Sequence, residues 1–305
     1  MLRLSAARAI QTGGVRALQY IDSTDVITYG HAVRVVTLGT GSPLPDPHRA
    51  GPATLVEAAG RHLLVDCGRG VLMRLAGVGL QAGALDGVLL THLHSDHVTD
   101  LADVITTRWI SSLVPNPLPV FGPPGTARLV ERTLEMLADD IAYRLAHHAD
   151  LTWEPAVAVT EVVDGAVPVG GDVEVTAAPT DHAPVRPTLG YRVQAGGAAS
   201  VVAGDTVPCA GLDRLAAGAD VLVHTVVRSS PIEAVGVPRL TDVLDYHSTV
   251  TQAADTARRA GVGTLVLTHL VPAPAPGTEP EWLAEAATVF DGRVVLATDG
   301  WSMSV

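Results

Sequence analysis

Short apolar runs rich in Val and Leu alternate with amphipathic segments from His31 onward, and turn residues such as Gly, Pro and Asp separate them. Apolar runs of about four to eight residues are typical of buried strands, whereas apolar residues three and four apart are typical of helices. The pattern predicts an α/β fold with strands over residues 32–38, 53–58, 62–66, 87–91 and 119–121, and, in a second set from residue 157 onward, over 172–177, 188–194, 200–203, 220–224, 264–268 and 293–297.

Segments in which apolar residues recur three and four positions apart, as in helices, lie between the predicted strands. Strand pairs typical of hairpins occur beside strand–helix–strand units. Because the order is mixed, a sandwich of two sheets with outer helices fits better than a doubly wound parallel sheet. The predicted helices cover residues 70–75, 98–112, 126–139, 212–217, 249–260 and 281–290.

A single domain is expected over residues 31–305. The sequence shows no repeat with a period of about 20–50 residues, and its Pro-rich stretch at residues 272–280 is too short for a domain linker. Residues 1–30 are expected to form an N-terminal extension, with disorder and a wrongly assigned start as open alternatives. This extension lacks the continuous apolar stretch and the small-residue cleavage pattern of a signal peptide.

Composition supports a compact globular protein. Hydrophobic residues make up 47% of the 305 residues and charged residues 17%. No apolar run reaches the roughly 18 residues that a membrane span needs, so no membrane partner is expected. The two cysteines, Cys67 and Cys209, are too few for a disulfide framework, and free thiols favour a cytoplasmic location.

The charged residues of the chain exclude several kinds of catalysis and disfavour some partners. Lys and Arg together number 20 against 32 acidic residues, which gives a net charge of −12, and every one of the basic residues is Arg. The absence of Lys excludes Schiff-base chemistry, a P-loop lysine and a lysine general base. The negative net charge disfavours the long-range attraction of a polyanion such as RNA.

The strongest chemical signal is a group of metal-ligand residue types between a predicted strand and a predicted helix, in the order His92, Leu93, His94, Ser95, Asp96, His97. Residues two apart in an extended chain point to the same side, so the first two histidines can hold one ion. Where the chain turns into the helix, the Asp and the third His point elsewhere and can hold a second ion. The alternative, a His-rich surface loop, is disfavoured because imidazole and carboxylate at this density are costly unless a metal uses them.

A dinuclear site needs more ligands than this segment provides, and His182, Asp205 and His269 follow later apolar strands. Gly204 permits a tight backbone exit before Asp205, whose carboxylate can bridge two cations. Taken singly, each of these residues could equally be a turn or core residue. Their joint placement after the first group favours a shared metal site.

These motifs, together with Leu38–Ser42, Val65–Gly68, Phe121–Gly125 and Tyr246–Thr249, resemble the metallo-β-lactamase fold. Within that superfamily the chain is most similar to the ribonuclease Z branch and to its arylsulfatase and cyclic-nucleotide phosphodiesterase relatives. The resemblance spans residues 33 to 299. It implies an αββα sandwich with two Zn²⁺ ions at one edge of the sheets, with Mn²⁺ or Fe²⁺ as open substitutes.

The resemblance also implies a role for each site residue. One metal would be held by His92, His94 and His182, and the other by Asp96, His97 and His269, with Asp205 bridging them. The resemblance implies two catalytic residues: Asp96, which would orient or deprotonate the attacking hydroxide, and His247, which would stabilise charge on the substrate phosphate or protonate the leaving oxygen. Asp66 would orient the ligand segment, or alternatively cap the next helix.

Three departures from the ribonuclease Z pattern bear on the substrate. Ser95 replaces a usual Gly, as in the arylsulfatase-like members. Thr225 stands after His224 where the family has a Glu that would orient His247. Too few residues separate Tyr191 from Asp205 for the long arm that grips tRNA. RNA therefore stays an open substrate, and small phosphodiesters are expected to be turned over better than intact precursor tRNA.

The activity implied is zinc-dependent hydrolysis of phosphodiester bonds by metal-activated hydroxide. Sulfate-ester hydrolysis and cyclic-nucleotide hydrolysis on the same site are the alternatives. A metal-stabilised binding module is disfavoured, because structural zinc sites are closed by four protein ligands. The resemblance further suggests a homodimer, for which the helix predicted over residues 98–112 could supply the interface.

Overall fold

The computed structural model describes residues 11–12, 15–16 and 32–305 of the chain. The chain divides into two compact units, Met1–His31 and Ala32–Val305. In the first unit, β2 (Gln11–Thr12) pairs antiparallel with β3 (Val15–Arg16). The rest of the extension predicted over residues 1–30 lies outside the described residues.

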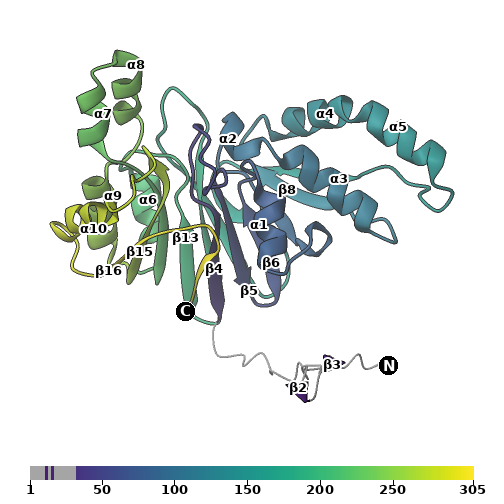
Figure 1. Ribbon diagram of the computed structural model, residues 1–305, viewed down its shortest axis with the longest axis horizontal. Coiled ribbons are helices and arrows are strands. Elements are labelled where there is room, and N and C mark those ends of the chain that lie inside the picture. The colour runs from purple at the N-terminus through teal and green to yellow at the C-terminus, as the bar shows by residue number, and fades with distance from the viewer. Residues whose placement is uncertain (1–10, 13–14, 17–31) are drawn as a thin grey trace. The chain divides into compact units, whose positions relative to one another are not determined.

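The larger unit is built on two seven-stranded sheets that pack face to face (Figure 1). The first sheet has the order β17-β4-β5-β6-β7-β8-β9, antiparallel from β17 to β6 and parallel from β6 to β9. Its strands are β4 (Val33–Gly39), β5 (Ala53–Ala58), β6 (Arg61–Val65), β7 (Gly87–Leu89), β8 (Leu118–Gly122), β9 (Val157–Glu161) and β17 (Trp301–Ser304).

The second sheet has the order β10-β11-β12-β13-β14-β15-β16, antiparallel up to β13 and parallel beyond it. A short turn at Gly196 and Gly197 joins β12 directly to β13, and both glycines have positive φ. Its strands are β10 (Gly165–Val167), β11 (Glu174–Pro179), β12 (Leu189–Ala195), β13 (Ala198–Val202), β14 (Val221–Val227), β15 (Thr264–Val271) and β16 (Arg293–Leu296).

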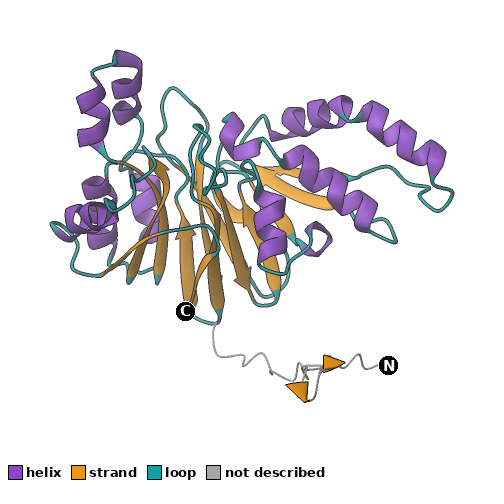
Figure 2. Ribbon diagram, viewed as in Figure 1, coloured by secondary structure: helices purple, strands orange, loops and turns teal. Residues whose placement is uncertain are grey.

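Helices cover the outer face of each sheet (Figure 2). On the first sheet lie α1 (Val71–Gly77), α2 (Ser95–Val98), α3 (Leu101–Ser111) and α4 (Thr126–Met136), followed by α5 (Ala138–His147), with the 3₁₀ helix η1 (Ala82–Ala84) beside them. On the second lie α6 (Ala210–Ala216), α9 (Val250–Ala260) and α10 (Glu279–Ala287). Beyond β14 the chain forms α7 (Ser229–Val235), α8 (Pro238–Thr241) and η2 (Asp242–Asp245). The arrangement is the αββα sandwich that the sequence predicts.

Apolar side chains fill three layers of the sandwich. Between the sheets, residues such as Val35 and Val56 of the first pack with Val193 and Val223 of the second. Two further clusters lie between each sheet and its own helices. All residues of β14 are buried, because a central parallel strand is covered on both faces. This rigid core fixes the strand ends from which the functional side chains project.

Several elements differ from the predicted ones. The helix predicted over 98–112 corresponds to α3, which begins at Leu101 after the separate helix α2 ends at Val98, and the helix predicted over 126–139 ends at Met136 and is followed by α5. No residue of α5 is buried, although apolar and polar residues alternate along it at helical spacing. The sequence also does not predict α7, α8 or β17.

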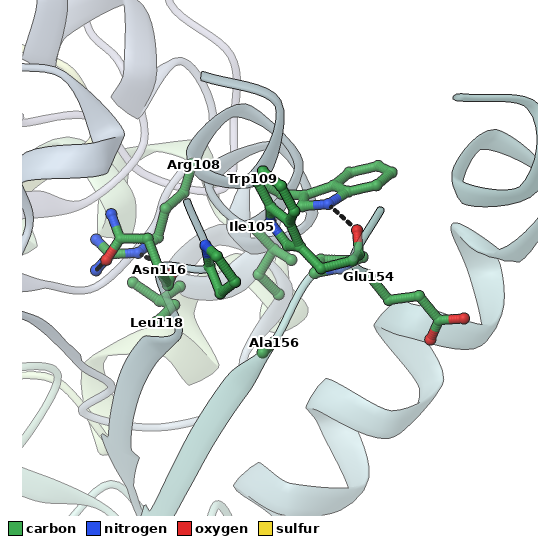
Figure 3. Close-up of a pocket in the computed structure, with 10 residues that line it drawn as sticks. Ile105, Arg108, Trp109, Asn116, Leu118, Glu154 and Ala156 are labelled. Carbon is green, nitrogen blue, oxygen red and sulfur yellow. Dashed lines mark hydrogen bonds between the residues drawn. The ribbon is translucent and has the colours of Figure 1, made fainter. Parts of the chain in front are cut away.

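The helix α3 uses its apolar face inside its own chain. Trp109 is buried, and its indole Nε1 donates a hydrogen bond to the carbonyl of Trp153 at 2.7 Å (Figure 3). Arg108 beside it donates to the carbonyls of Ala82 and Leu85. This face of α3 therefore packs inside the chain and is not available to a partner subunit. Among the described residues, no helix is long and apolar enough to cross a membrane.

Candidate metal centre

The His-rich segment follows β7 and leads into α2, as the sequence predicts. His92 is buried in the extended part, and His94 stands at the N-cap of α2 with extended backbone. Asp96 and His97 lie in the first turn of the helix, where a negative side chain is favoured by the helix dipole. The turn between strand and helix therefore aims the two halves of the segment in different directions.

The first group that can hold a metal ion comprises His92, His94, His182 and Asp205, whose ligand atoms lie within 4.8 Å of one another. His94 Nδ1 is 3.0 Å from His92 Nε2 and 3.3 Å from His182 Nε2. Two imidazole nitrogens on one tetrahedral zinc, with Zn–N of about 2.0–2.1 Å, stand about 3.3 Å apart. The nitrogens are thus spaced as zinc ligands would be.

The second group comprises Asp96, His97 and His269. Asp96 Oδ2 is 3.2 Å from His269 Nε2 and 3.7 Å from His97 Nε2. His269 lies near the end of β15 with φ 48, in the left-handed region that a non-Gly residue rarely adopts. Backbone strain of this kind is concentrated at functional sites, where the surrounding fold holds it in place.

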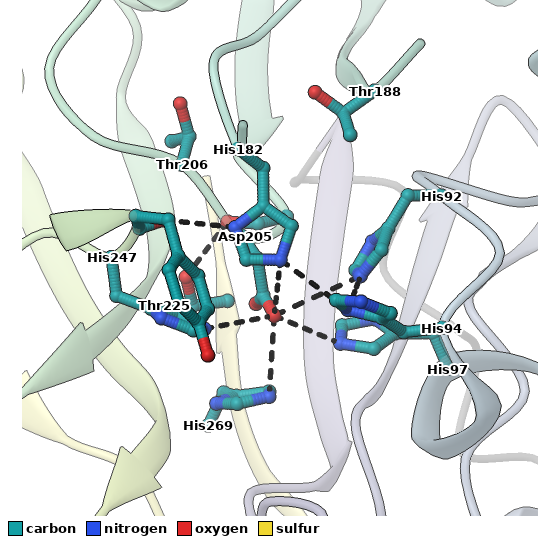
Figure 4. Close-up of polar contacts among 12 residues, drawn as sticks. His92, His94, His97, His182, Thr188, Asp205, Thr206, Thr225, His247 and His269 are labelled. Carbon is teal, nitrogen blue, oxygen red and sulfur yellow. Dashed lines mark hydrogen bonds and ion pairs between the residues drawn. The ribbon is translucent and has the colours of Figure 1, made fainter. Parts of the chain in front are cut away.

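Asp205 Oδ2 lies between the two groups (Figure 4). It is 3.8 Å from Nε2 of both His92 and His182, and it is 3.3 Å from His97 Nε2 and 3.5 Å from His269 Nε2. Gly204 makes this placement possible, because its φ is 65 and an added Cβ would lie 2.8 Å from Thr91 Cβ. A carboxylate in this position can bridge two cations.

Hydrogen bonds fix the ligand faces of two imidazoles. His97 Nδ1 donates to Asp66 Oδ2 at 2.8 Å, and His182 Nδ1 donates to the carbonyl of Tyr246 at 2.8 Å. Each bond leaves Nε2 free to bind a metal. Asp66 also accepts from the backbone of Thr91, and α1 has Gly70 at its N-cap. Asp66 thus orients the ligand segment, and it does not cap the following helix.

Burial and neighbouring charges shift the pKa values of several residues of the site. Burial lowers the pKa of His92 well below its usual value and that of His182 to about 4, so both are neutral at pH 7. Burial also opposes the charged forms of His97 and His269, but the carboxylate of Asp205 outweighs it and raises both pKa values. The same two histidines hold the pKa of Asp205 well below its usual value despite its burial.

The donor set of the two groups fits a divalent cation, and His97 Nε2 faces the second group without a hydrogen-bond partner among the described residues. His269 Nδ1 and Asp205 Oδ1 are also buried without a partner among these residues. Such atoms are rare in folded proteins because each costs about 1–3 kcal/mol. Imidazole nitrogens and carboxylate oxygens are the ligands that zinc and related divalent ions accept.

His247 lies beside the two groups. Its Nε2 is 3.3 Å from Asp205 Oδ2, and its Nδ1 donates to the carbonyl of Val243 at 2.9 Å. Thr225, which stands where the family has Glu, instead donates to the carbonyl of Gly204 at 2.8 Å. A backbone carbonyl therefore orients His247. Sequence reasoning missed Val243, because a backbone acceptor leaves no trace in residue type.

Sequence reasoning also missed one wall of the site. A cavity of about 570 Å³ opens beside the metal-ligand residues and is bounded on the other side by α7, α8 and the loop at residues 42–46. The start and end signals of these helices are present, since Gly236 follows α7 and Pro238 begins α8. Both helices are shorter than the segments that periodicity detects.

Comparison with known proteins agrees with the fold. The family described as the beta-lactamase superfamily domain matches residues 61–270. The ribonuclease Z of Mycobacterium avium (strain 104) is 60% identical over 269 residues, which cover 88% of this chain and 96% of the relative. The ribonuclease Z of Mycobacterium tuberculosis (strain ATCC 25618 / H37Rv) is 54% identical over the same shares.

Solved structures share the fold at lower identity. The metallo-beta-lactamase fold protein YhfI from Bacillus subtilis superposes with a TM-score of 0.70 at 24% identity, covering 90% of this chain and 99% of its own. The short form of human tRNase Z gives 0.66 at 24% identity, covering 89% and 99%. Since the superfamily match includes most of the chain and the ribonucleases Z match nearly from end to end, the chain belongs to the ribonuclease Z family of the β-lactamase superfamily.

Proposed function

We propose that the chain hydrolyses phosphodiester bonds, with RNA among its substrates, at a pair of zinc ions. The observation that carries this proposal is the position of Asp205 Oδ2, 3.3–3.8 Å from imidazole nitrogens of both metal-ligand groups. The relatives are named ribonuclease Z, which favours phosphodiesters over the sulfate esters that the same site geometry would admit.

The proposed ligand sets follow the two groups. His92, His94 and His182 would hold one ion, Asp96, His97 and His269 the other, and Asp205 would bridge them. When bound, two zinc ions lower the pKa of a water molecule toward 7 and bind a phosphate oxygen, and Mn²⁺ or Fe²⁺ can substitute.

Two residues would handle protons. The pKa of Asp96 is lowered, because a hydrogen bond from His269 and the charge of His97 outweigh its burial, so it is an ionised acceptor at neutral pH. It can therefore orient the attacking water or take its proton. The Nδ1–H of His247 donates to the carbonyl of Val243, so Nε2 faces the site, and in the imidazolium form Nε2–H would donate to a phosphate oxygen or to the leaving group.

The connection between β12 and β13 bears on how RNA would bind. The strands β12 and β13 are joined by the turn at Gly196 and Gly197, so this connection has no room for an arm that would hold the body of a tRNA. We propose that the enzyme recognises the ester near the metals, where contact-range forces act whatever the net charge of the protein.

A homodimer is part of the proposal. At the end of α3 the side chains of Leu113 and Val114 are 92% and 66% exposed, beside the exposed Ile110. Exposed apolar side chains that cluster at a helix end are typical of protein interfaces. Light scattering of the eluting protein should give twice the chain mass, and Leu113→Asp should lower it toward the monomer. An unchanged dimer in that variant would place the interface elsewhere.

The function is tested by metal content and by a panel of substrates. We expect zinc-loaded protein to hold two ions per chain and to turn over bis(p-nitrophenyl) phosphate and a precursor tRNA faster than p-nitrophenyl sulfate or 3′,5′-cyclic AMP. A single ion per chain would argue against the bridging site. Preferential sulfate release would overturn the phosphodiester assignment.

A further inference from the structure

A carboxylate outside the two metal-ligand groups ties the edges of both sheets together. Asp299 lies between β16 and β17, where the chain crosses from the edge of the second sheet to the edge of the first. Its side chain is 6% exposed. Asp299 Oδ1 accepts from the backbone N–H and from the hydroxyl of Thr40 at 3.0 and 2.7 Å. Asp299 Oδ2 accepts from the backbone N–H of Ala50 at 2.7 Å and pairs with Arg74 Nε of α1 at 2.9 Å. The loop at residues 40–50 is therefore held at both of its ends by one side chain.

The first end of this loop contacts the strand that carries His269. The carbonyl of Thr40 accepts a hydrogen bond from the backbone N–H of Leu270 at 3.1 Å. Leu270 directly follows His269, whose φ of 48 is unfavourable for a non-Gly residue and persists only where neighbouring contacts impose it. The hydrogen bond from Leu270 is such a contact, and it depends on the position of Thr40.

The second end of the loop leads to the backbone of Asp96. Gly51 follows Ala50, and its N–H donates to the carbonyl of Arg69 at 2.8 Å. A Cβ added to Gly51 would lie 2.5 Å from Arg69 N, and a Cβ added to Gly68 would lie 2.7 Å from the carbonyl oxygen of Asp96. The three segments thus pack backbone against backbone, with no side chain between them that could absorb a shift of the loop.

We propose that Asp299 is a positioning residue for the second metal-ligand group, which comprises Asp96, His97 and His269. Its carboxylate holds the loop at residues 40–50 in place, and the loop holds the backbone at two of the three ligands of this group. Among residues 32–305, neither Thr40 nor Ala50 hydrogen-bonds to a member of the first group. The inference rests on the proposed two-ion site and assigns to Asp299 an effect on one of the two ions.

The test measures metal binding by Asp299→Asn. The amide keeps the size of the side chain, but its NH₂ would face a donor in either orientation, because both carboxylate oxygens accept hydrogen bonds. Metal-free protein is titrated with Zn²⁺ by calorimetry, and with Co²⁺ by visible absorption, which reports the ligand geometry of the ion. His269→Ala identifies the binding step that belongs to the second group. In Asp299→Asn the dissociation constant of that same step should rise at least about tenfold, while the constant of the other step stays within about twofold.

Asp86→Asn is the matched control. Asp86 Oδ2 accepts from the backbone N–H of His62 at 2.8 Å and Oδ1 pairs with Arg61 at 2.7 Å, so this carboxylate also joins a backbone segment to an Arg. Asp86 precedes β7, whereas the metal-ligand segment follows that strand. Both substitutions should lower the free energy of unfolding of the metal-free protein, but only Asp299→Asn should weaken the step of the second group. An unchanged step in Asp299→Asn, or a rise shared equally by both steps, would reduce Asp299 to a structural role and overturn the proposal.

A milder substitution decides the proposal if Asp299→Asn does not fold. Thr40→Val removes the hydroxyl that donates to Asp299 and keeps the backbone hydrogen bonds of residue 40, and Thr40→Ser retains a hydroxyl. Thr40→Val should raise the dissociation constant of the second-group step several-fold, and Thr40→Ser should leave it close to the wild-type value. With Asp299→Asn unfolded, an unchanged step in Thr40→Val would overturn the proposal.

These measurements are separate from the proposed function, because none of them uses a substrate. Two ions per chain without hydrolysis of any diester would refute the phosphodiesterase activity, and the effect of Asp299→Asn on the second-group step would still decide the positioning role. A wild-type protein whose metal affinity does not respond to His269→Ala would hold no ion in the second group, and this result would overturn the positioning role.

Discussion

At the scale of residues, one carboxylate oxygen organises the candidate site. Asp205 Oδ2 lies within 3.8 Å of imidazole nitrogens from four separate positions in the sequence, and His247 also points Nε2 at it. Such a concentration of polar atoms away from water is unfavourable unless a cation or protons compensate it. Asp205, which follows β13 in the chain, therefore couples the two halves of the sandwich through their charges.

Asp205→Ala should abolish activity and remove metal. Without the bridging carboxylate, two adjacent cations would repel each other without screening, and four histidines would lose their common acceptor. Elemental analysis of the purified variant should show well under one ion per chain. Wild-type metal content with a wild-type rate would contradict the bridging role.

His247→Ala should separate chemistry from metal binding. Since His247 belongs to neither metal-ligand group, zinc content should stay at the wild-type level. The value of kcat should fall roughly 10²-fold or more, as expected for a lost general acid or charge-stabilising contact. Loss of zinc from this variant would instead make His247 a ligand. His48→Ala, at an exposed loop position, serves as the control.

His224 should make stability depend on pH. Burial lowers its folded-state pKa to about 4, against about 6.5 in an unfolded chain. The unfolded state therefore binds the proton more readily between these values, and stability is lost as pH falls from about 6.5 toward 4. In metal-free protein, urea unfolding at pH 7.5 and pH 5 should show a loss roughly 2 kcal/mol larger than in His224→Gln. Equal losses would mean that His224 stays neutral in both states.

The residues of the candidate metal centre could be predicted from the sequence because the residue types that bind metals are visible in it. His and Asp after buried strands are visible in the sequence, and all seven predicted ligands enter the two groups. The contacts that orient them were less accessible. The carbonyl of Val243 and the hydroxyl of Thr225 act through positions that only the folded backbone defines.

At the scale of elements, strands predicted from apolar runs agree with the structure to within a few residues, because a strand buried on both faces must be apolar throughout. Elements outside the core were not predictable in this way. The helix α5 has no buried residue, α7 and α8 are short, and the terminal strand β17 lies at a sheet edge. Of these elements, α7 and α8 form one wall of the cavity beside the metal-ligand residues.

The helix α9 gives a prediction at this scale, because its N-cap, Thr249, lies two residues after His247. The hydroxyl of Thr249 accepts from the backbone of Gln252 at 3.2 Å, and the Gln252 side chain accepts from the backbone of Thr249 at 2.9 Å, forming a capping box. Thr249→Ala should lower the free energy of unfolding by about 1 kcal/mol. Thr249→Ser should keep most of the free energy of unfolding that the cap contributes. Chemical denaturation measures both, and equal stability of the two variants would show that the cap contributes little.

At the scale of the whole molecule, the sandwich places a compact, charge-dense metal centre in a protein with a net charge of −12. Two divalent cations would cancel only about a third of that charge. Association with a long polyanion is then opposed at distances beyond about 8–10 Å, while contacts within the site are hardly affected. The net charge therefore affects the rate at which a charged substrate associates with the protein, and the proposed metal site affects the rate of the chemical step.

We therefore expect small phosphodiesters or short oligonucleotides to give a higher kcat/KM than intact precursor tRNA at 0.15 M salt. The turn at Gly196 and Gly197 joins β12 directly to β13, so this connection carries no long insertion that could contact a tRNA body. Raising the salt from 0.05 to 0.3 M should change the tRNA rate less than for a basic nuclease, because few ion pairs with phosphates would be broken. Efficient removal of a tRNA 3′ trailer, with only marginal cleavage of small diesters, would refute this preference and show that local Arg contacts overcome the net charge.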